Sequence, residues 1–306
     1  ATITVTGLGN YSGTKTLTFT IDPISLTETM VALNTENFIY NGSDQKPSVE
    51  VTNGTTPLIY GSDYTYSFTT SDNVAITSSI DKGTYKVVVV GCHNYAGAIT
   101  KTYTIAPRSI SSASVTLSTL SSYVYDGTVK RPTVSSVAFG SDVVPTTDYD
   151  VAYSTDGIAA GTVTVTVTGK NNHTGTKTTT YTIQPKAVTA SMISLDYTSF
   201  TYTGSLIKPN VTVSDGSLAM TIDTDYTLEN NGGTLLGTYN VAITGKGNYT
   251  GTATVTFEIV AQGASAFTIE PIANQEYTGS PLTPALTVKN QSGTTLTPTT
   301  DYTVTY

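Results

Sequence analysis

Hydrophobic and polar residues alternate strictly in several segments of this chain. The clearest segment, 161–169, reads Gly-Thr-Val-Thr-Val-Thr-Val-Thr-Gly. Its three valines fall on one face and its threonines on the other, which is typical of a half-buried β-strand. A Gly- and Asn-rich stretch follows, and then a second alternating segment that ends at Tyr181 and Ile183. Because glycine and asparagine tolerate the positive φ of tight turns, we expect the two segments to form a β-hairpin.

The same hairpin pattern occurs four times along the chain. We expect the apolar face of each first strand to lie in a core, and these residues are Ile3, Val5, Tyr85, Val87, Val89, Val163, Val165, Val167, Tyr239, Val241 and Ile243. The second strands end in an aromatic residue and an isoleucine, at Phe19 and Ile21, Tyr103 and Ile105, Tyr181 and Ile183, and Phe257 and Ile259. A further strand is predicted upstream, at 48–52, 133–134, 210–213 and 286–288. A proline lies just before each of them, which suits the start or edge of a strand.

Two further landmarks repeat with the same period as the hairpins. A Tyr-x-Gly motif begins at Tyr40, Tyr125, Tyr202 and Tyr277, with spacings of 85, 77 and 75 residues. An Asp-Tyr pair begins at Asp63, Asp148, Asp225 and Asp301, with spacings of 85, 77 and 76 residues. Several landmarks that keep one period over most of the chain indicate a tandem array.

The period predicts five segments. We expect the C-terminal hairpin of a truncated repeat at 1–23, complete β-sandwich repeats at 24–107, 108–185 and 186–261, and the N-terminal half of a further repeat at 262–306. About six or seven short strands per repeat favour an immunoglobulin-like sandwich, while a small β fold with another strand order stays open. Most joints pass directly from a strand to a proline, which stiffens them. The predicted fold is therefore an all-β tandem array of small immunoglobulin-like β-sandwich domains that forms an elongated rod.

Composition and charge restrict the function. The net charge of −8 and the pI near 4.6 leave no basic stripe for nucleic acid, so we expect no nucleic-acid partner. The longest aliphatic run, Val87–Val90, is far shorter than a membrane span, so we expect no membrane insertion in this segment. A single cysteine, Cys92, permits no internal disulfide. Packing and ladder hydrogen bonds must hold these repeats together.

The motif set resembles the MBG/YDG-type tandem β repeats of large bacterial surface adhesins. The resemblance covers essentially the whole chain, and the first complete repeat departs most, through a longer insert at 69–82. The residues that carry it are Tyr125-Asp126-Gly127, Tyr202-Thr203-Gly204-Ser205, Tyr277-Thr278-Gly279-Ser280, the Asp-Tyr pairs, and Gly-Lys-Gly-Asn-Tyr-Thr-Gly at 245–251. It implies an extracellular, bacterial cell-surface location and a role in a stalk or in adhesion, and it supplies no catalytic residues.

The recurring aspartates and the few histidines are the candidates for site chemistry. Calcium binds clustered carboxylates, but no Asp-x-Asp-x-Asp-Gly loop is present, so we favour a turn role for the aspartates of the Asp-Tyr pairs. Cys92-His93 is an isolated variation, and His173 stands where other repeats have tyrosine. We therefore predict that the chain is not an enzyme, and that it has no catalytic, cofactor-binding or metal-binding residues and no cofactor.

Glycan binding, an intradomain isopeptide bond and glycosylation are weaker alternatives for the chemistry of this chain. The 21 tyrosines recur at fixed repeat positions, which favours core and corner packing over a shallow glycan-binding surface. Matched buried lysines for an intradomain isopeptide bond are lacking. Glycosylation sequons begin at Asn10, Asn41, Asn53, Asn172, Asn210, Asn248 and Asn290, and a chain so rich in Asn, Ser and Thr contains most of them by chance.

We predict a non-enzymatic stalk or spacer in a bacterial cell-surface or extracellular adhesin or fibre, whose partners are the neighbouring repeats of the same chain. One alternative is a direct adhesin that binds host or environmental glycans or proteins through the variable loops 69–82 and 137–147. Another is a head-to-tail filament of copies of this chain, in which the hairpin 1–22 of one molecule completes 262–306 of the next. We favour over this filament the interpretation that the 306 residues are a window on a longer array, in which neighbouring sequence completes both ends.

Overall fold

The computed structural model describes all residues from 1 to 306, and the chain is all-β. No α-helix is present. The only helical elements are single turns of 3₁₀ helix, η1 to η5, at Glu28–Met30, Ile110–Ser112, Thr146–Asp148, Ala190–Met192 and Ala264–Ala266. The chain divides into two compact units, which are described separately below. The first comprises 1–118, 132–154 and 164–179, and the second comprises 119–131, 155–163 and 180–306.

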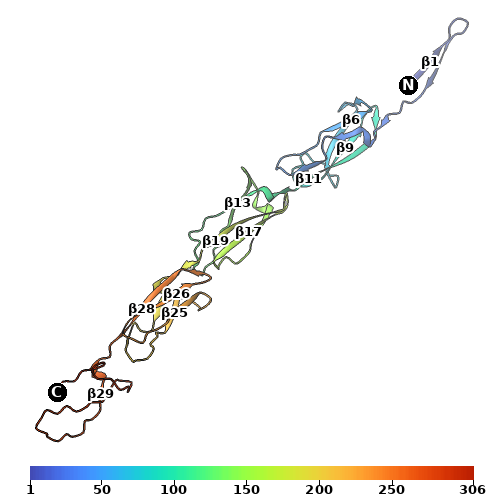
Figure 1. The fold of residues 1–306 in the computed structure, drawn as a ribbon. Helices are drawn as coiled ribbons and strands as arrows, with labels where there is room; N and C mark the ends of the chain where they lie inside the picture. The colour runs from blue at the N-terminus through green and yellow to red at the C-terminus, as the bar shows by residue number, and fades with distance from the viewer. The chain divides into compact units, whose positions relative to one another are not determined.

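The first unit begins with an isolated hairpin (Figure 1), which is followed by two sheets. The hairpin pairs β1 (Thr2–Thr6) with β2 (Thr14–Thr18). The smaller sheet is antiparallel and has the order β4 (Val31–Leu33), β6 (Val49–Asn53), β7 (Thr56–Pro57). The larger sheet has the order β5 (Asn37–Ile39), β11 (Ala98–Ala106), β9 (Gly83–Gly91), β8 (Tyr64–Thr70), with β5 parallel to β11. A parallel pair, β3 (Ile24–Ser25) and β10 (Tyr95–Ala96), joins the start of the repeat to its hairpin turn.

The next repeat has corresponding sheets, and the boundary between the two units passes through it. Its parallel pair is β12 (Arg108–Ser109) with β18 (His173–Thr174). Its smaller sheet has the order β13 (Ser114–Leu117), β14 (Val134–Phe139), β15 (Asp142–Val143). Its larger sheet has the order β16 (Tyr149–Tyr153), β17 (Gly161–Gly169), β19 (Thr176–Ile183). An isolated parallel bridge, Val124 to Gln184, takes the place of a β5-like strand.

The remainder of the second unit repeats the same strand order. Its parallel pair is β20 (Lys186–Ala187) with β27 (Tyr249–Thr250). The smaller sheet has the order β21 (Ile193–Leu195), β23 (Val211–Asp215), β24 (Leu218–Ala219). The larger sheet has the order β22 (Ser199–Thr201), β28 (Thr252–Val260), β26 (Gly237–Gly245), β25 (Tyr226–Asn230). A short hairpin of β29 (Thr268–Ile269) and β30 (Val288–Lys289) follows.

The alternating segments form the core strands, as their pattern predicts. Val87, Val89, Val163, Val165, Val167, Val241 and Ile243 are all at most 2% exposed. In the first repeat, Val87 and Val89 of the larger sheet share a cluster with Val31 and Val51 of the smaller sheet. The two sheets therefore enclose one apolar core, and its burial is the main stabilising term in a repeat without disulfides.

The prediction that Ile3 and Val5 are core residues is wrong. Their side chains are 50% and 64% exposed, and Phe19 and Ile21, which follow the partner strand β2, are also exposed. The reason is that β1 pairs only with β2, so no second sheet covers the apolar face of this hairpin. The alternation predicts the strands correctly, but burial also needs an opposing sheet.

The structure also corrects the proposed variable loop at 137–147. This segment is not a free loop, because residues 134–139 form β14, which turns back through Gly140 into β15. Val137 and Val144 lie in the core beside Ile110. The predicted strands at 48–52 and 210–213 are confirmed as β6 and β23, with ends shifted by one or two residues. The predictions at 133–134 and 286–288 overlap β14 and β30 by only one residue each.

The turns between the long hairpin strands share one tight backbone geometry. The third residue of each has positive φ, at Gly9, His93, Asn171 and Gly247. The first glycine of each donates its N–H to the last glycine's carbonyl, as in Gly245 to Gly251 at 2.9 Å. A Cβ on Gly245 would lie 2.5 Å from the backbone nitrogen of Thr250, so no other residue fits there without a shift of the main chain.

One testable consequence concerns the core of the third repeat. Ile243→Asp places an unpaired carboxylate at a fully buried site, and we expect a loss of about 4 kcal/mol or more in its free energy of unfolding. Thr244→Asp introduces the same side chain at the next, exposed position, and we expect a change below about 0.5 kcal/mol. Chemical denaturation followed by circular dichroism measures both. Equal destabilisation of the two variants would refute the assigned register.

A second consequence concerns alkaline pH. Burial raises the pKa of Tyr64, Tyr103, Tyr226 and Tyr249 above its ordinary value. The unfolded chain then releases these protons at lower pH than the folded chain, so this contribution to stability is present below about pH 10 and lost above it. We expect phenolate absorbance and loss of the β circular-dichroism signal to rise together above that pH. Complete ionisation of all tyrosines with the β signal intact would contradict the burial.

Candidate functional site

Three of the four aspartates in the Asp-Tyr pairs shape a turn. In each, the carboxylate accepts the backbone N–H of the residue four positions earlier: Asp63 from Ile59 at 2.9 Å, Asp225 from Thr221 at 2.8 Å and Asp301 from Thr297 at 2.7 Å. This is the turn role expected from the sequence. No group of three or more His, Cys, Asp or Glu side chains is arranged to hold a metal ion.

Asp148 departs from the other three aspartates and pairs with a histidine. Its Oδ2 lies 3.1 Å from Nδ1 of His173, and both side chains are buried. Thr147 and Asn171 complete the contacts of the carboxylate. The other histidine, His93, lies in the turn of a different repeat, with Nδ1 2.7 Å from the carbonyl oxygen of Ser62. The structure thus gives each histidine a local structural partner.

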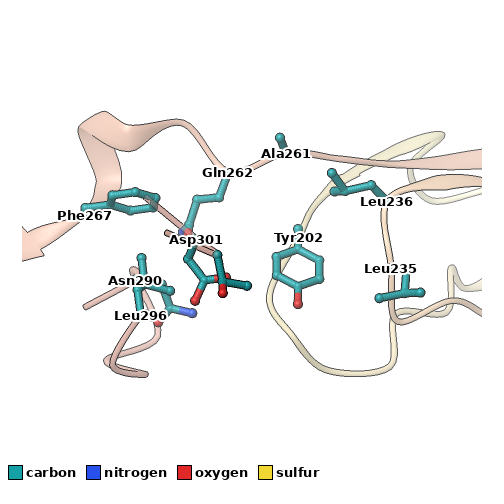
Figure 2. Close-up of a pocket in the computed structure, with 10 residues that line it drawn as sticks. Tyr202, Leu235, Leu236, Ala261, Gln262, Phe267, Asn290, Leu296 and Asp301 are labelled. Carbon is teal, nitrogen blue, oxygen red and sulfur yellow. The ribbon is translucent and has the colours of Figure 1, made fainter. Parts of the chain in front are cut away.

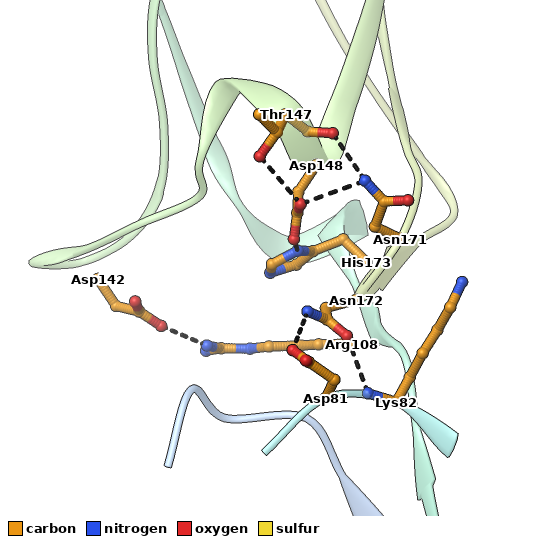
Figure 3. A network of polar contacts seen from close by, with 9 residues as sticks. All are labelled: Asp81, Lys82, Arg108, Asp142, Thr147, Asp148, Asn171, Asn172 and His173. Atoms are coloured by element: carbon orange, nitrogen blue, oxygen red, sulfur yellow. Dashed lines mark hydrogen bonds and ion pairs between the residues drawn. The ribbon is translucent and has the colours of Figure 1, made fainter.

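The sites with the most specific geometry are the junctions between successive repeats. The first junction lies within the first unit, where the turn 169–175 meets the residues just before Gly83 (Figure 3). Asn172 Oδ1 accepts the backbone N–H of Lys82 at 2.8 Å, and Asn172 Nδ2 donates to Asp81 Oδ1 at 2.8 Å. One asparagine side chain therefore bonds to two consecutive residues of the preceding repeat.

Aromatic rings and a cation surround this asparagine. The ring of Tyr40 meets the ring of His173 edge-on, with centroids 5.3 Å apart. His173 in turn stacks over Phe139 at 6.4 Å, and the Arg108 guanidinium lies 3.6 Å from the centroid of the same Phe139 ring. Arg108 also pairs with Asp142 at 2.5 Å. Of these contacts, only the one between Tyr40 and His173 joins two repeats. The contacts of Arg108 lie within one repeat, and its partly exposed ion pair with Asp142 contributes little.

The second junction lies within the second unit and uses the same positions. Asn248 Oδ1 accepts the backbone N–H of Ala160 at 2.8 Å. The ring of Tyr249 meets the ring of Tyr125 edge-on, with centroids 5.4 Å apart and an interplanar angle of 79°. Tyr249 is only 4% exposed, and burial followed by the nearby Asp215 carboxylate raises its pKa well above the usual range.

The two junctions correspond residue by residue. Lys82 and Ala160 each precede the glycine that begins the long hairpin, and both donate their main-chain N–H. Asn172 and Asn248 both occupy the fourth position of the turn, and the aromatic residue after each contacts the tyrosine of the Tyr-x-Gly motif. Arg108 and Lys186 begin the two repeats but have different partners. Arg108 contacts Phe139 and Asp142, whereas Lys186 donates to both carboxylate oxygens of Asp215, at 2.7 and 2.8 Å.

Sequence reasoning found these landmarks but not their contact. The sequence pattern gives the Tyr-x-Gly motif and the hairpins, with their Gly- and Asn-rich turns, one period, and it favours core and corner packing for the tyrosines. The structure instead brings the tyrosine of one repeat against the turn of the next. Their equal period was the available signal, because two sites that touch across every junction must recur together.

A pocket lies next to Tyr202, the tyrosine that corresponds to Tyr125 (Figure 2). It has a volume of about 330 Å³ and belongs entirely to the second unit. Apolar side chains form much of its wall, and its lining residues are Tyr202, Leu235, Leu236, Ala261, Gln262, Phe267, Asn290, Leu296, Thr300 and Asp301. Leu235 and Leu236 remain largely exposed to solvent.

The insert 69–82, which was a candidate binding loop, is partly engaged within its own repeat. The Ser79 hydroxyl is buried, donates to the Gln45 carbonyl at 2.8 Å, and lies 2.8 Å from the Tyr103 hydroxyl. Asp81 and Lys82 at its end make the junction contacts described above. This insert therefore serves the fold and the junction at several positions.

Two of the seven sequon asparagines are used by the junctions. The side-chain amides of Asn172 and Asn248 accept hydrogen bonds from the preceding repeat. A glycan attached to either asparagine would displace its hydrogen bond. A third, Asn290, is buried.

Comparison with known proteins assigns this chain to no family. No protein-family model matches the chain, and no curated protein matches it. Among solved structures, the extracellular cadherin domains 1–4 of protocadherin gamma B7 align at 12% identity over 74% of this chain and 76% of that one, with a TM-score of 0.18. Domains 3–6 of protocadherin gamma B2 align at 10% identity over 76% and 77%, with a TM-score of 0.20. The human desmocollin-1 ectodomain aligns at 12% identity over 78% and 63%, with a TM-score of 0.18. TM-scores this low establish neither a shared fold nor a shared function.

The junction hydrogen bond can be tested by amide hydrogen exchange. Asn248→Ala removes the acceptor of the Ala160 N–H, and we expect this amide to exchange about fivefold faster, which corresponds to a lost hydrogen bond of about 1 kcal/mol. Lys82, whose acceptor is Asn172, serves as an internal control and should be unchanged. An Ala160 amide with the same protection in both proteins would show that Asn248 does not hold this junction.

Proposed function

We propose that this chain is a non-enzymatic spacer: a tandem array of immunoglobulin-like β-sandwich domains that forms an elongated stalk. The observation that carries the proposal is the recurrence of one contact set, in which a turn asparagine and its aromatic neighbour bind the preceding repeat. Repeats joined by the same contacts add length in equal steps without adding new chemistry, which is the property that a spacer requires.

Further support comes from the residues between the repeats. The strand β11 ends at Ala106, and Arg108 of β12 already pairs with the turn of the next repeat, so a single residue separates the two strands. This residue is Pro107, whose fixed φ restricts the joint. Short joints with direct contacts favour a stiff array over freely jointed domains.

We place this spacer in an extracellular adhesin or fibre of a bacterial cell surface. The support is the resemblance of the Tyr-x-Gly, Asp-Tyr and Gly-x-x-Asn-Tyr motifs to MBG/YDG-type repeats. The chain contains no helix with the length and apolar character that a membrane crossing needs. Its acidic character is compatible with a solvated surface protein.

Small-angle X-ray scattering of the 306-residue chain tests the spacer function. We expect a maximum dimension several times the cross-sectional diameter, together with a cross-section that corresponds to a single repeat. The junction variants Asn172→Ala and Asn248→Ala should broaden the distance distribution, because each loosens one joint. A compact particle of ordinary globular dimensions would refute the spacer.

A further inference from the structure

A polar depression lies on the outer face of the larger sheet in the third repeat. It has a volume of about 330 Å³ and belongs entirely to the second unit, and its lining residues are Glu229, Asn231, Gly232, Tyr239, Asn240, Ala242 and Thr254. The register places Glu229, Ala242 and Thr254 side by side on the adjacent strands β25, β26 and β28. Because Ala242 carries only a methyl group, it forms a floor between two polar side chains.

The ladder between β25 and β26 ends at this depression. In the second repeat, Ser154 donates its N–H to the Thr164 carbonyl at 2.9 Å, and Ser154 Oγ accepts the Thr164 N–H at 2.9 Å. Asn231 and Asn240 occupy the corresponding positions, but no hydrogen bond joins them, because β25 ends at Asn230. The main-chain N–H and C=O of Asn240 therefore face the depression without a partner strand.

The loop that follows β25 is held in place by its glycines. Gly233 exchanges two main-chain hydrogen bonds with Ile207, at 2.8 and 2.9 Å. A Cβ on Gly232 would lie 2.5 Å from the Ile207 carbonyl oxygen, so the loop packs too closely there for any other residue. Asn231 precedes this fixed pair, and its Nδ2 donates to Glu229 Oε1 at 3.2 Å. The rim of the depression is therefore preorganised.

The polar side chains of this face are specific to the third repeat. The positions of Glu229, Asn231 and Asn240 hold alanine, serine and threonine in the second repeat, and serine, threonine and lysine in the first. All three repeats nevertheless form the same hairpin strands. The acid and the two amides are therefore not required by the architecture of the repeat.

A following repeat would leave the depression open. In the first two repeats, the residues that contact the repeat after them are Tyr40, Asp81, Lys82, Tyr125, Gly127 and Ala160. None of these residues occupies a position equivalent to one that lines the depression. The depression is thus a property of the third repeat itself.

The groups around the depression match a ligand that carries several neighbouring hydroxyl groups. The carboxylate of Glu229 accepts hydrogen bonds, while the amides of Asn231 and Asn240 both donate and accept, as a sugar hydroxyl does. Calcium needs more oxygen ligands than this single carboxylate and its neighbours supply. An extended peptide needs a longer free strand edge than Asn240 alone. The net charge of −8 disfavours an acidic polymer.

We propose that this depression is a binding site for a neutral saccharide. One sugar ring lies over the Ala242 methyl group, and its hydroxyls exchange hydrogen bonds with Glu229, Asn231, Asn240 and Thr254. Adjacent strands are about 4.8 Å apart, so the walls at Glu229 and Thr254 stand roughly 10 Å from each other, which suits the width of one ring. The site lies on a sheet face, outside the loops 69–82 and 137–147, and adds a ligand to the array independently of its spacer function.

Nuclear magnetic resonance titration of the 306-residue chain tests the proposal. The probes are maltohexaose, cellohexaose, chitohexaose and mannohexaose, with heparin and calcium chloride as charged comparisons. We expect at least one neutral oligosaccharide to bind with a Kd of about 1 mM or below. Its binding should shift the backbone amide signals of Glu229, Asn240 and Ala242 and leave those of the first two repeats unchanged.

Variants of the lining identify the site. Glu229→Ala and Asn240→Ala each remove hydrogen-bonding groups, and we expect each to weaken binding about fivefold or more. Ala242→Gln fills the floor and should have at least the same effect, at a position that holds threonine or valine in the other repeats. Thr227→Ala is the matched control, because Thr227 is exposed on β25 two residues before Glu229 and does not line the depression.

Three results would overturn the proposal: no binding of any neutral probe up to about 10 mM, shifts at these residues with only heparin or calcium, or equal weakening by Thr227→Ala and Glu229→Ala. An elongated chain that binds none of the neutral probes would remove this site and leave the proposed spacer function intact. A compact chain that binds one of them would do the reverse, so scattering and titration distinguish the two.

Discussion

The tight turn between the two long strands of each hairpin is the constraint on which the rest of the structure depends. A Cβ on its first glycine would meet the main chain of the returning strand, at 2.5 Å in the case of Gly245. That steric limit fixes where the chain reverses, and a reversal at a fixed point sets the register of both strands. The register then decides which valines enter the core and which side chains the turn presents to the preceding repeat.

The turn also explains how a weakly charged, disulfide-free chain joins its repeats. The start of each repeat pairs in parallel with its own turn, as Lys186 does with Tyr249. Main-chain hydrogen bonds therefore fix the position of the turn within its repeat. A side chain on a turn fixed in this way loses little further freedom when it makes a contact. Asn248 and Tyr249 can therefore act as a preorganised pair, although each contributes only one polar or aromatic contact.

The periodic patterns made much of the fold predictable. Alternation located the hairpin strands, and apolar segments just after a proline located β6 and β23 closely and β14 and β30 only by one shared residue. Burial was less predictable, because Ile3 and Val241 have the same local pattern while only Val241 faces a second sheet. The segment 137–147 was misread as a loop because its polar residues, Gly140 to Asp142, form a two-strand turn between buried valines. The junction was not predicted, since alternation describes faces within a repeat, and only the equal period of the turn and the Tyr-x-Gly motif pointed to their contact.

The donor in the junction hydrogen bond is a main-chain N–H, and this has an evolutionary consequence. Lysine at 82 and alanine at 160 serve equally well, because any residue except proline offers the same group. The specific part of the joint consists of the asparagine and the aromatic residue of one turn and the tyrosine of the Tyr-x-Gly motif in the preceding repeat, and all three recur with the period. Unequal recombination that duplicates or deletes a whole period would therefore leave every new joint with a matching donor and acceptor. An array built in this way can change its copy number in a single genetic step, without compensating substitutions.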